Sequence, residues 1–167
     1  MKTYYSLSQT LSEAAVKWVR PALASLQQEY AVEYKKHPLD TDPFPTVEDF
    51  LKAVSQSKTM TITAEIDKQI LNRSRSKTMG QLLGLIKTYR SYPQYRNEKT
   101  LAKLEKLITT GGVVEMPIVY RLENGEFRIM SGNTRMDIAF MHGTNPTVII
   151  LDLTKTVKSK LAKSKVR

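Results

Sequence analysis

The chain contains 167 residues, of which 41% are hydrophobic and 25% are charged, and its formal net charge is +10. This composition is typical of a globular protein with one hydrophobic core, and the absence of cysteine excludes disulfides, thiolate metal sites and a cysteine nucleophile. No apolar run approaches the ~18 residues that a membrane span needs, and no signal-peptide pattern is present, so we expect a cytoplasmic protein without a membrane partner. The positive charge favours polyanions such as nucleic acid or nucleotides as partners, although a soluble protein can also be basic without one.

Residues 1–72 are predicted to be mainly helical, because apolar residues recur there at helical spacing. Thr46, followed by acidic residues, is typical of a capped helix start. The stretch 37–46 carries three prolines and predicts a loop. The predicted elements of this part are helices over 12–19, 23–34, 47–57 and 64–72 and a strand over 59–63.

Basic residues gather in three places. The cluster 73–77, just before a helix predicted over 78–89, is either a solvated loop or a contact for nucleic-acid phosphates. In 89–96, arginines and tyrosines are interleaved, which suits a surface for phosphates and bases and equally a packed turn. The tail 154–167 has six basic residues and no acid. The candidate nucleic-acid-binding residues are Arg73, Arg75, Lys77, Lys158, Lys160 and Lys163.

The second half of the chain alternates helices and strands. Asn124 and Gly125, between two apolar runs, predict a β-hairpin whose turn takes a positive φ at both residues. The predicted elements are a helix over 100–108, strands over 117–122 and 127–130, a helix over 134–141 and a buried strand over 147–153.

The second hairpin strand leads through Ser131 and Gly132 directly into a helix. The first amides of a helix have no intrahelical acceptor and lie at the positive end of its dipole, so this junction is a candidate anion site. Glycine lets the backbone approach a ligand, Thr134 adds a hydroxyl, and Arg135 adds a guanidinium suited to phosphate oxygens. The alternative is that Asn133 or Thr134 only caps the helix and that Arg135 pairs with a carboxylate.

The order of these elements, together with the residues in 117–119, 127–139, Gly143 and 148–150, resembles the nucleotide-binding domain shared by ParB partition proteins and sulfiredoxin. Upstream, 93–96 and the following helix look like the first conserved box of ParB, so the resemblance covers about 92–153. It implies a small mixed sheet with packed helices. The phosphate-binding residues that it implies are Arg96, Ser131, Gly132, Asn133, Thr134 and Arg135.

The chain departs from both relatives at two positions. Sulfiredoxin-like proteins carry their catalytic cysteine at the position of Asn133 and a histidine at that of Thr134, so sulfinic-acid reduction is excluded. ParB-like proteins carry an acid and an extra arginine there, which puts a ParB-style CTP switch in doubt. The frame of Gly132 and Arg135 is retained, and with it the expected phosphate site.

Kinase-like members of this fold imply an acid near the nucleotide. Glu98 follows the box that contains Arg96, and Glu115 precedes the first hairpin strand. Either carboxylate could hold Mg²⁺ through water or accept a proton from a hydroxyl, so both are candidate catalytic residues. We therefore expect Mg²⁺ and a nucleoside triphosphate or diphosphate as ligands, and no metal site built by the protein alone.

The sequence thus predicts an α+β fold with a helical extension over 1–72, a ParB/sulfiredoxin-like domain over 73–153 and a basic tail over 154–167. The predicted function is nucleotide-phosphate binding, and the enzyme class, if the protein is an enzyme, is an NTP hydrolase or a phosphotransferase acting on a nucleotide or small molecule. One alternative is a non-specific DNA-binding module or nuclease. Another is a phage or mobile-element protein that modulates a host protein. The oligomeric state is left open.

Overall fold

The computed structural model describes residues 15–88 and 98–154, and it confirms the predicted α+β class. The elements in chain order are β1 (Lys17–Val19), α2 (Leu23–Glu29), the π-helix η1 (Tyr30–Tyr34), α3 (Val47–Gln56), β2 (Lys58–Thr61), α4 (Ala64–Asp67), β3 (Ile70–Leu71), α5 (Met79–Thr88), α6 (Glu98–Thr109), β4 (Val113–Glu115), β5 (Ile118–Arg121), β6 (Phe127–Ser131), α7 (Asn133–Met141) and β7 (Thr147–Asp152).

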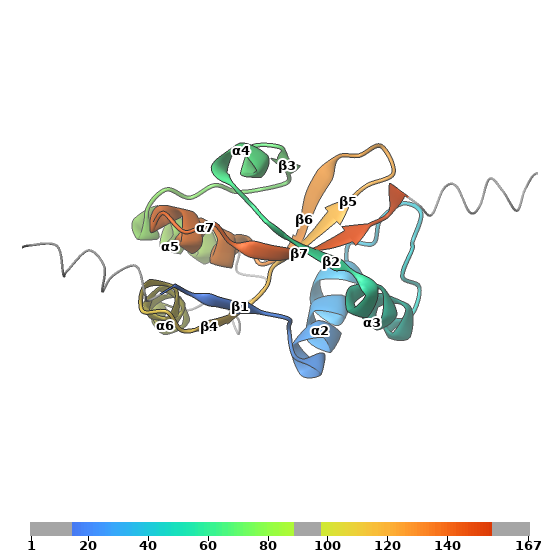
Figure 1. Cartoon of the computed structure of the whole chain (residues 1–167), viewed down its shortest axis with the longest axis horizontal. Helices are drawn as coiled ribbons and strands as arrows, with labels where there is room; N and C mark the ends of the chain where they lie inside the picture. Colours follow the sequence, from blue (N-terminus) through green and yellow to red (C-terminus); the bar gives the residue numbers. More distant parts are fainter. Residues whose placement is uncertain (1–14, 89–97, 155–167) are drawn as a thin grey trace, which may run out of the picture.

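A mixed five-stranded sheet forms the centre of the molecule, with the strand order β2-β7-β5-β6-β3. The pairs β5–β7 and β3–β6 are parallel, whereas β2–β7 and β5–β6 are antiparallel. Below this sheet in Figure 1, β1 and β4 form a separate two-stranded parallel sheet. Both edge strands of the central sheet, β2 and β3, come from residues 1–72. The predicted division at residue 73 stays a prediction about folding units, but the two parts build one sheet.

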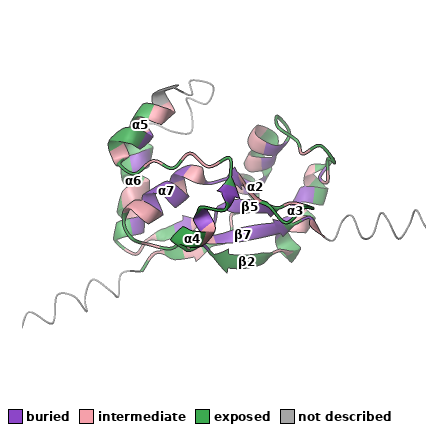
Figure 2. Cartoon of the chain, turned by 90° about the horizontal axis from the view of Figure 1, so that it is seen from above, coloured by how far each residue is buried: buried purple, intermediate pink, exposed green. Residues whose placement is uncertain are grey.

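The hydrophobic core lies on both faces of the central sheet. Helices α2, η1 and α3 pack against one face, where Ile118 of β5 and Ile149 of β7 are fully buried. The opposite face presents Val119 and Val148, which pack against Met136 of α7. A third cluster joins α5, α6 and α7 through Leu82, Leu101 and Ile138. Figure 2 shows β5 and β7 as buried and β2 as exposed, as expected for central and edge strands.

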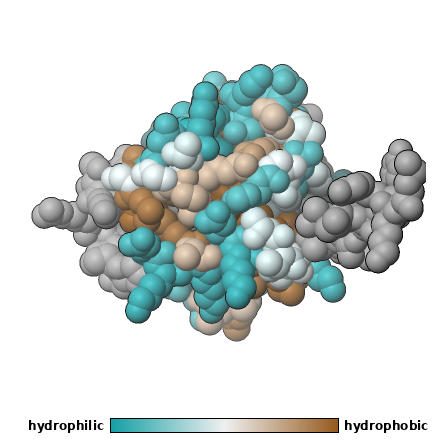
Figure 3. Space-filling model, turned by 90° about the vertical axis from the view of Figure 1, so that its left-hand side faces the viewer, coloured by the Kyte–Doolittle hydropathy of each residue, from teal (hydrophilic) through white to brown (hydrophobic). Residues whose placement is uncertain are grey.

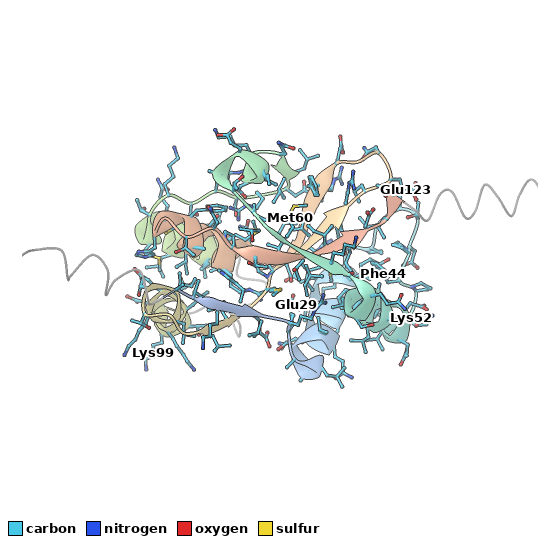
Figure 4. All side chains as sticks on the ribbon, in the orientation of Figure 1. Glu29, Phe44, Lys52, Met60, Lys99 and Glu123 are labelled. Carbon is cyan, nitrogen blue, oxygen red and sulfur yellow. The ribbon has the colours of Figure 1, made fainter. Side chains whose placement is uncertain are left out.

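Local signals in the sequence placed several elements well. Thr46 and Asp49 form a reciprocal capping box at the start of α3, so the predicted cap is confirmed. The β5–β6 hairpin is confirmed as well, and Figure 4 shows Glu123 at its tip. Its turn differs in one respect: Gly125 has a φ of +85°, but Asn124 does not have a positive φ. The amide of Leu122 donates to the carbonyl of Glu126, so the loop is one residue longer than a two-residue turn and needs only one left-handed residue.

Two helix predictions were wrong in part. Lys17–Val19, predicted as helix, forms strand β1 because it pairs with Val113–Glu115, a strand that the sequence analysis missed. The helix predicted over 64–72 ends at Asp67, and Ile70–Leu71 then pairs with β6. In both cases pairing with a distant strand overrides the local helical pattern.

None of the helices in the described ranges is long and apolar enough to cross a membrane. On the side of the molecule that Figure 3 shows, apolar and polar side chains are mixed rather than separated into one large apolar face.

Candidate functional site

An open cleft of about 1500 Å³ lies between α2, η1, α5, α6, β4 and β6 and reaches the first turn of α7. Of the six residues of the predicted phosphate site, Arg96 lies outside the described residues and the other five line this cleft; they are Ser131, Gly132, Asn133, Thr134 and Arg135. The structure therefore brings the predicted residues together at one concave surface, which is where small ligands usually bind.

Gly132 is the N-cap of α7 and has a φ of +90°, in the left-handed region that favours glycine. A Cβ at this position would lie 2.6 Å from the Cβ and 2.8 Å from the Cα of Pro117. The sequence predicted that glycine is needed here to leave room for a ligand, but the structure gives a different reason for it. The space beside Gly132 is filled by Pro117, so the glycine is required by the turn and by backbone packing.

Ser131 and Thr134 contribute two buried hydroxyls to this junction. Each residue is only 6% exposed. Within the described part of the chain, neither Ser131 Oγ nor Thr134 Oγ1 has a hydrogen-bond partner. An unpaired buried hydroxyl costs about 1–3 kcal/mol, so two of them beside one helix start call for a ligand or an ordered water.

The side chain of Asn133 points to the loop that follows β3. Its Oδ1 accepts a hydrogen bond from Arg73 Nη1 at 2.7 Å, and its Nδ2 donates to the carbonyl of Ser74 at 3.1 Å. Asn133 therefore fastens this loop to α7. Only its backbone amide remains as a candidate ligand group.

The guanidinium of Arg135 makes hydrogen bonds and an ion pair within the protein. Its Nη1 donates to the carbonyls of Glu115 at 2.8 Å and Met116 at 3.3 Å, and its Nη2 lies 3.2 Å from Glu29 Oε1. Figure 4 shows Glu29 near the middle of the molecule, at the end of α2. The alternative prediction, that Arg135 pairs with a carboxylate, is thus confirmed. This contact joins α2, the β4–β5 connection and α7.

Arg73 lies in a buried ion-pair cluster and not on a solvated loop. Its side chain is 1% exposed, and its guanidinium lies 2.8 Å from Asp67 Oδ1 and 2.9 Å from Asp137 Oδ1. Arg75 is more exposed and lies 3.3 Å from Asp67 Oδ2. Of the basic residues predicted in this loop, Lys77 is exposed. Arg73 could reach a nucleic-acid phosphate only by leaving these partners.

Burial raises the pKa of the Asp137 carboxyl, and the Arg73 guanidinium and the Ser76 amide counteract only part of that effect. The amide of Ser76 donates to Asp137 Oδ2 at 3.1 Å. Asp67 and Asp137 were not among the predicted site residues. Asp137 is a single acid between apolar residues, which can mark a buried ion pair, whereas Asp67 lies among other polar residues, and nothing local identified either partner.

The two candidate catalytic acids differ in position. Glu98, the first residue of α6, is exposed. It is not among the described residues that line the cleft. Glu115 lines the cleft, and its Oε1 accepts hydrogen bonds from the amide of Ala22 at 3.0 Å and from Ser25 Oγ at 2.9 Å. Glu115 thus closes the N-terminus of α2, where a negative charge is favourable.

This arrangement predicts unequal effects on stability. Glu115→Ala should lower the free energy of unfolding by about 2 kcal/mol, because two hydrogen bonds to a carboxylate are lost. Glu98→Ala should change it by less than about 0.5 kcal/mol, since the residue is exposed. Urea denaturation of both variants measures the difference. A larger loss for Glu98→Ala than for Glu115→Ala would contradict the assignment of Glu115 to the α2 terminus.

Some predicted site residues lie outside the described ranges; they are Arg96, Lys158, Lys160 and Lys163. In residues 15–88 and 98–154, no group of three or more histidine, aspartate or glutamate residues is arranged to hold a metal ion.

No protein-family model matches the chain, and no curated protein or solved structure matches it significantly. Fold and site together define a mixed α+β protein whose large cleft ends at a glycine-capped helix N-terminus.

Proposed function

We propose that the protein binds a nucleotide in this cleft, with a phosphate group at the start of α7. The observation that carries the proposal is the pair of buried, unpartnered hydroxyls of Ser131 and Thr134 beside the first turn of a nine-residue helix. The first-turn amides and the helix dipole favour an anion at the same place. A phosphate offers enough acceptor oxygens for both hydroxyls and the amides at once.

The rest of the cleft suits the nucleoside. One wall is formed by apolar side chains of α5 and α6, including Leu82, Ile86 and Leu104. A planar base has apolar faces that pack well against such side chains, and its polar edges can remain in the open part of the cleft. The combination of an apolar wall and a polar end therefore favours a nucleotide over free phosphate.

The resemblance to the ParB/sulfiredoxin-like domain supports the same proposal, because that resemblance rests on the strand–glycine–helix junction described above. It also suggests NTP hydrolysis or phosphoryl transfer as the reaction. Glu33 and Asp40 also line the cleft, and either carboxylate could contact, through water, a Mg²⁺ ion that is held mainly by the nucleotide phosphates. Bound there, Mg²⁺ would neutralise phosphate charge. The chain's own contribution is to position the phosphate through Ser131, Thr134 and the α7 amides.

The proposal is tested by titrating ATP, ADP, CTP and GTP, each with Mg²⁺, into the protein in a calorimeter. Thr134→Val is the informative variant, because valine has nearly the same shape and lacks the hydroxyl. We expect about tenfold weaker binding of the preferred nucleotide, as for loss of one hydrogen bond to a charged group. The free energy of unfolding of the free protein should be unchanged or slightly higher, because the hydroxyl has no partner within the described residues.

Thr59→Val on the exposed strand β2 is the matched control and should leave binding within twofold. The proposal fails if no nucleotide binds to the unmodified protein. It also fails if both valine variants weaken binding equally, since the effect would then not come from the α7 junction.

A further inference from the structure

Arg128 on β6 is a cation that lines the same cleft and that the sequence analysis did not single out. Its Nε atom is buried and has no hydrogen-bond partner in the part of the chain that the structure describes. No ion pair joins its guanidinium to an acid of those residues either, although Glu33 lines the same cleft. The residue as a whole is half-buried, so only part of its side chain is withdrawn from water. A guanidinium on the wall of a cleft that has no acid partner among the described residues is suited to pair with an anion that the protein binds.

Neither of the residues paired with Arg128 in the sheet supplies a negative charge for its guanidinium. Tyr120 on β5 is its cross-strand partner and is 5% exposed. Burial raises the pKa of the Tyr120 hydroxyl, with the charge of Glu33 adding to the effect, so the ring is a neutral phenol and not an anion for Arg128. On its other side, Arg128 is paired in the sheet with Leu71 of β3, which has no polar side-chain atom.

Arg128 and the α7 junction lie at the two ends of one strand. From Arg128 to Ser131 the β6 backbone spans roughly 10 Å, at about 3.3 Å per residue. Together with the long arginine side chain, this spacing matches a ligand that carries anionic groups several ångströms apart. Arg128 Nε, Ser131 Oγ and Thr134 Oγ1 are buried polar atoms without a partner in the described residues, and the three residues that carry them all line one cleft.

We propose that Arg128 forms a second anion subsite, which binds the distal phosphate of a polyphosphate chain whose proximal phosphate lies at the start of α7. This inference rests on the proposed nucleotide site and adds to it the residue that would discriminate nucleotides with two or more phosphates from monophosphates. Glu33 and Asp40 line the same cleft and contribute negative charge to it. The polyphosphate is therefore expected to bind together with Mg²⁺.

The test compares ATP, AMP and inorganic tripolyphosphate, each with Mg²⁺, by calorimetry on the full chain. The unmodified protein should bind ATP at least tenfold more tightly than AMP. In Arg128→Met, which keeps most of the side-chain volume, ATP and tripolyphosphate should bind about tenfold more weakly, as for loss of a charge-assisted hydrogen bond, while AMP stays within twofold. Arg128→Lys, which retains the charge without the planar fork, should lie between the two.

A second readout is the melting temperature of the ligand-free protein. Because Arg128 has no partner within the described residues, Arg128→Met should not lower this temperature and is expected to raise it by a few degrees. Arg121→Met on the neighbouring strand is the matched control. Arg121 is 48% exposed at its side chain and pairs with Asp152 at 3.7 Å, and this variant should leave the ratio of ATP to AMP affinity unchanged.

The outcomes separate the two proposals. If the unmodified protein binds neither AMP nor ATP, the nucleotide site itself is wrong and the subsite falls with it. If the protein binds both but Arg128→Met weakens them equally, or leaves their ratio unchanged, the nucleotide site stands and the second subsite is overturned. A marked fall in melting temperature in Arg128→Met would show that the guanidinium stabilises the free protein, which also contradicts the subsite.

Discussion

Gly132→Ala is expected to lower the free energy of unfolding by about 3–5 kcal/mol, through two effects that add. A left-handed conformation costs a residue with a Cβ about 1–3 kcal/mol. The new Cβ would also lie 2.6–2.8 Å from Pro117, and overpacking of this kind costs about 1–3 kcal/mol because the obstacle includes backbone. Equilibrium denaturation in guanidinium chloride measures the loss.

Gly125→Ala provides a matched control for the backbone effect alone. Gly125 also has a positive φ, of +85°, but nothing lies within 4 Å of a Cβ built there. Its substitution should cost only the conformational part, about 1 kcal/mol. Equal losses in the two variants would mean that Pro117 moves aside without cost. In that case the close packing of the β5 entry against the start of α7 would not be what requires glycine at 132.

Arg73→Met is expected to destabilise the protein by about 3–5 kcal/mol at neutral pH, because it leaves two acids near each other without their shared cation. The side chains of Arg73 and Asp137 are each 1% exposed, and that of Asp67 is 10% exposed. Arg75 remains beside Asp67, but Asp137 loses its ion-pair partner. The loss is measured by urea denaturation, with Lys68→Met as the control, since the Lys68–Glu65 pair is exposed and worth under about 1 kcal/mol.

Asp137→Asn should be much less harmful than Arg73→Met. Burial raises the pKa of Asp137, which means that its negative charge is disfavoured there, and asparagine removes this charge while keeping the shape of the side chain. The double variant Arg73→Met/Asp137→Asn should accordingly recover part of the stability that Arg73→Met loses. The full double-mutant cycle measures the coupling free energy, which is the difference between the loss in the double variant and the sum of the losses in the two single variants. Strictly additive losses would contradict the ion-pair cluster.

The stability of Arg73→Met relative to the unmodified protein should depend on pH in a definite direction. Asp137 has a raised pKa in the folded state, so its contribution to stability is greatest below the unfolded value of about 3.9 and is lost as the pH rises through the folded value. Removal of the Arg73 guanidinium raises the folded pKa further. The stability deficit of Arg73→Met relative to the unmodified protein should therefore shrink as the pH falls from 7 to 5, and a constant deficit would count against this account.

Local physical chemistry in the sequence was enough for several elements and for the position of the candidate site. The capping residues of α3, the apolar stripe of α6, the glycine of the β5–β6 turn and the strand–glycine–helix junction at Gly132 are each encoded within a few residues. Signals of this kind depend on φ, on helix periodicity and on nearby hydrogen bonds, and these change little when the rest of the chain is rearranged.

The tertiary structure alone decided which side chains of the site remain available. Arg135, expected to bind phosphate, meets Glu29 across 106 residues, and Arg73 meets Asn133 across 60 residues. Strand β1 forms only because Val113–Glu115 lies beside it. Such pairs join segments that are far apart in the chain, so no local pattern specifies them. The sequence by itself determined where the candidate anion site lies. Packing determined that Ser131, Thr134 and Arg128, rather than Arg135, line the cleft with a buried polar atom that has no partner in the described residues.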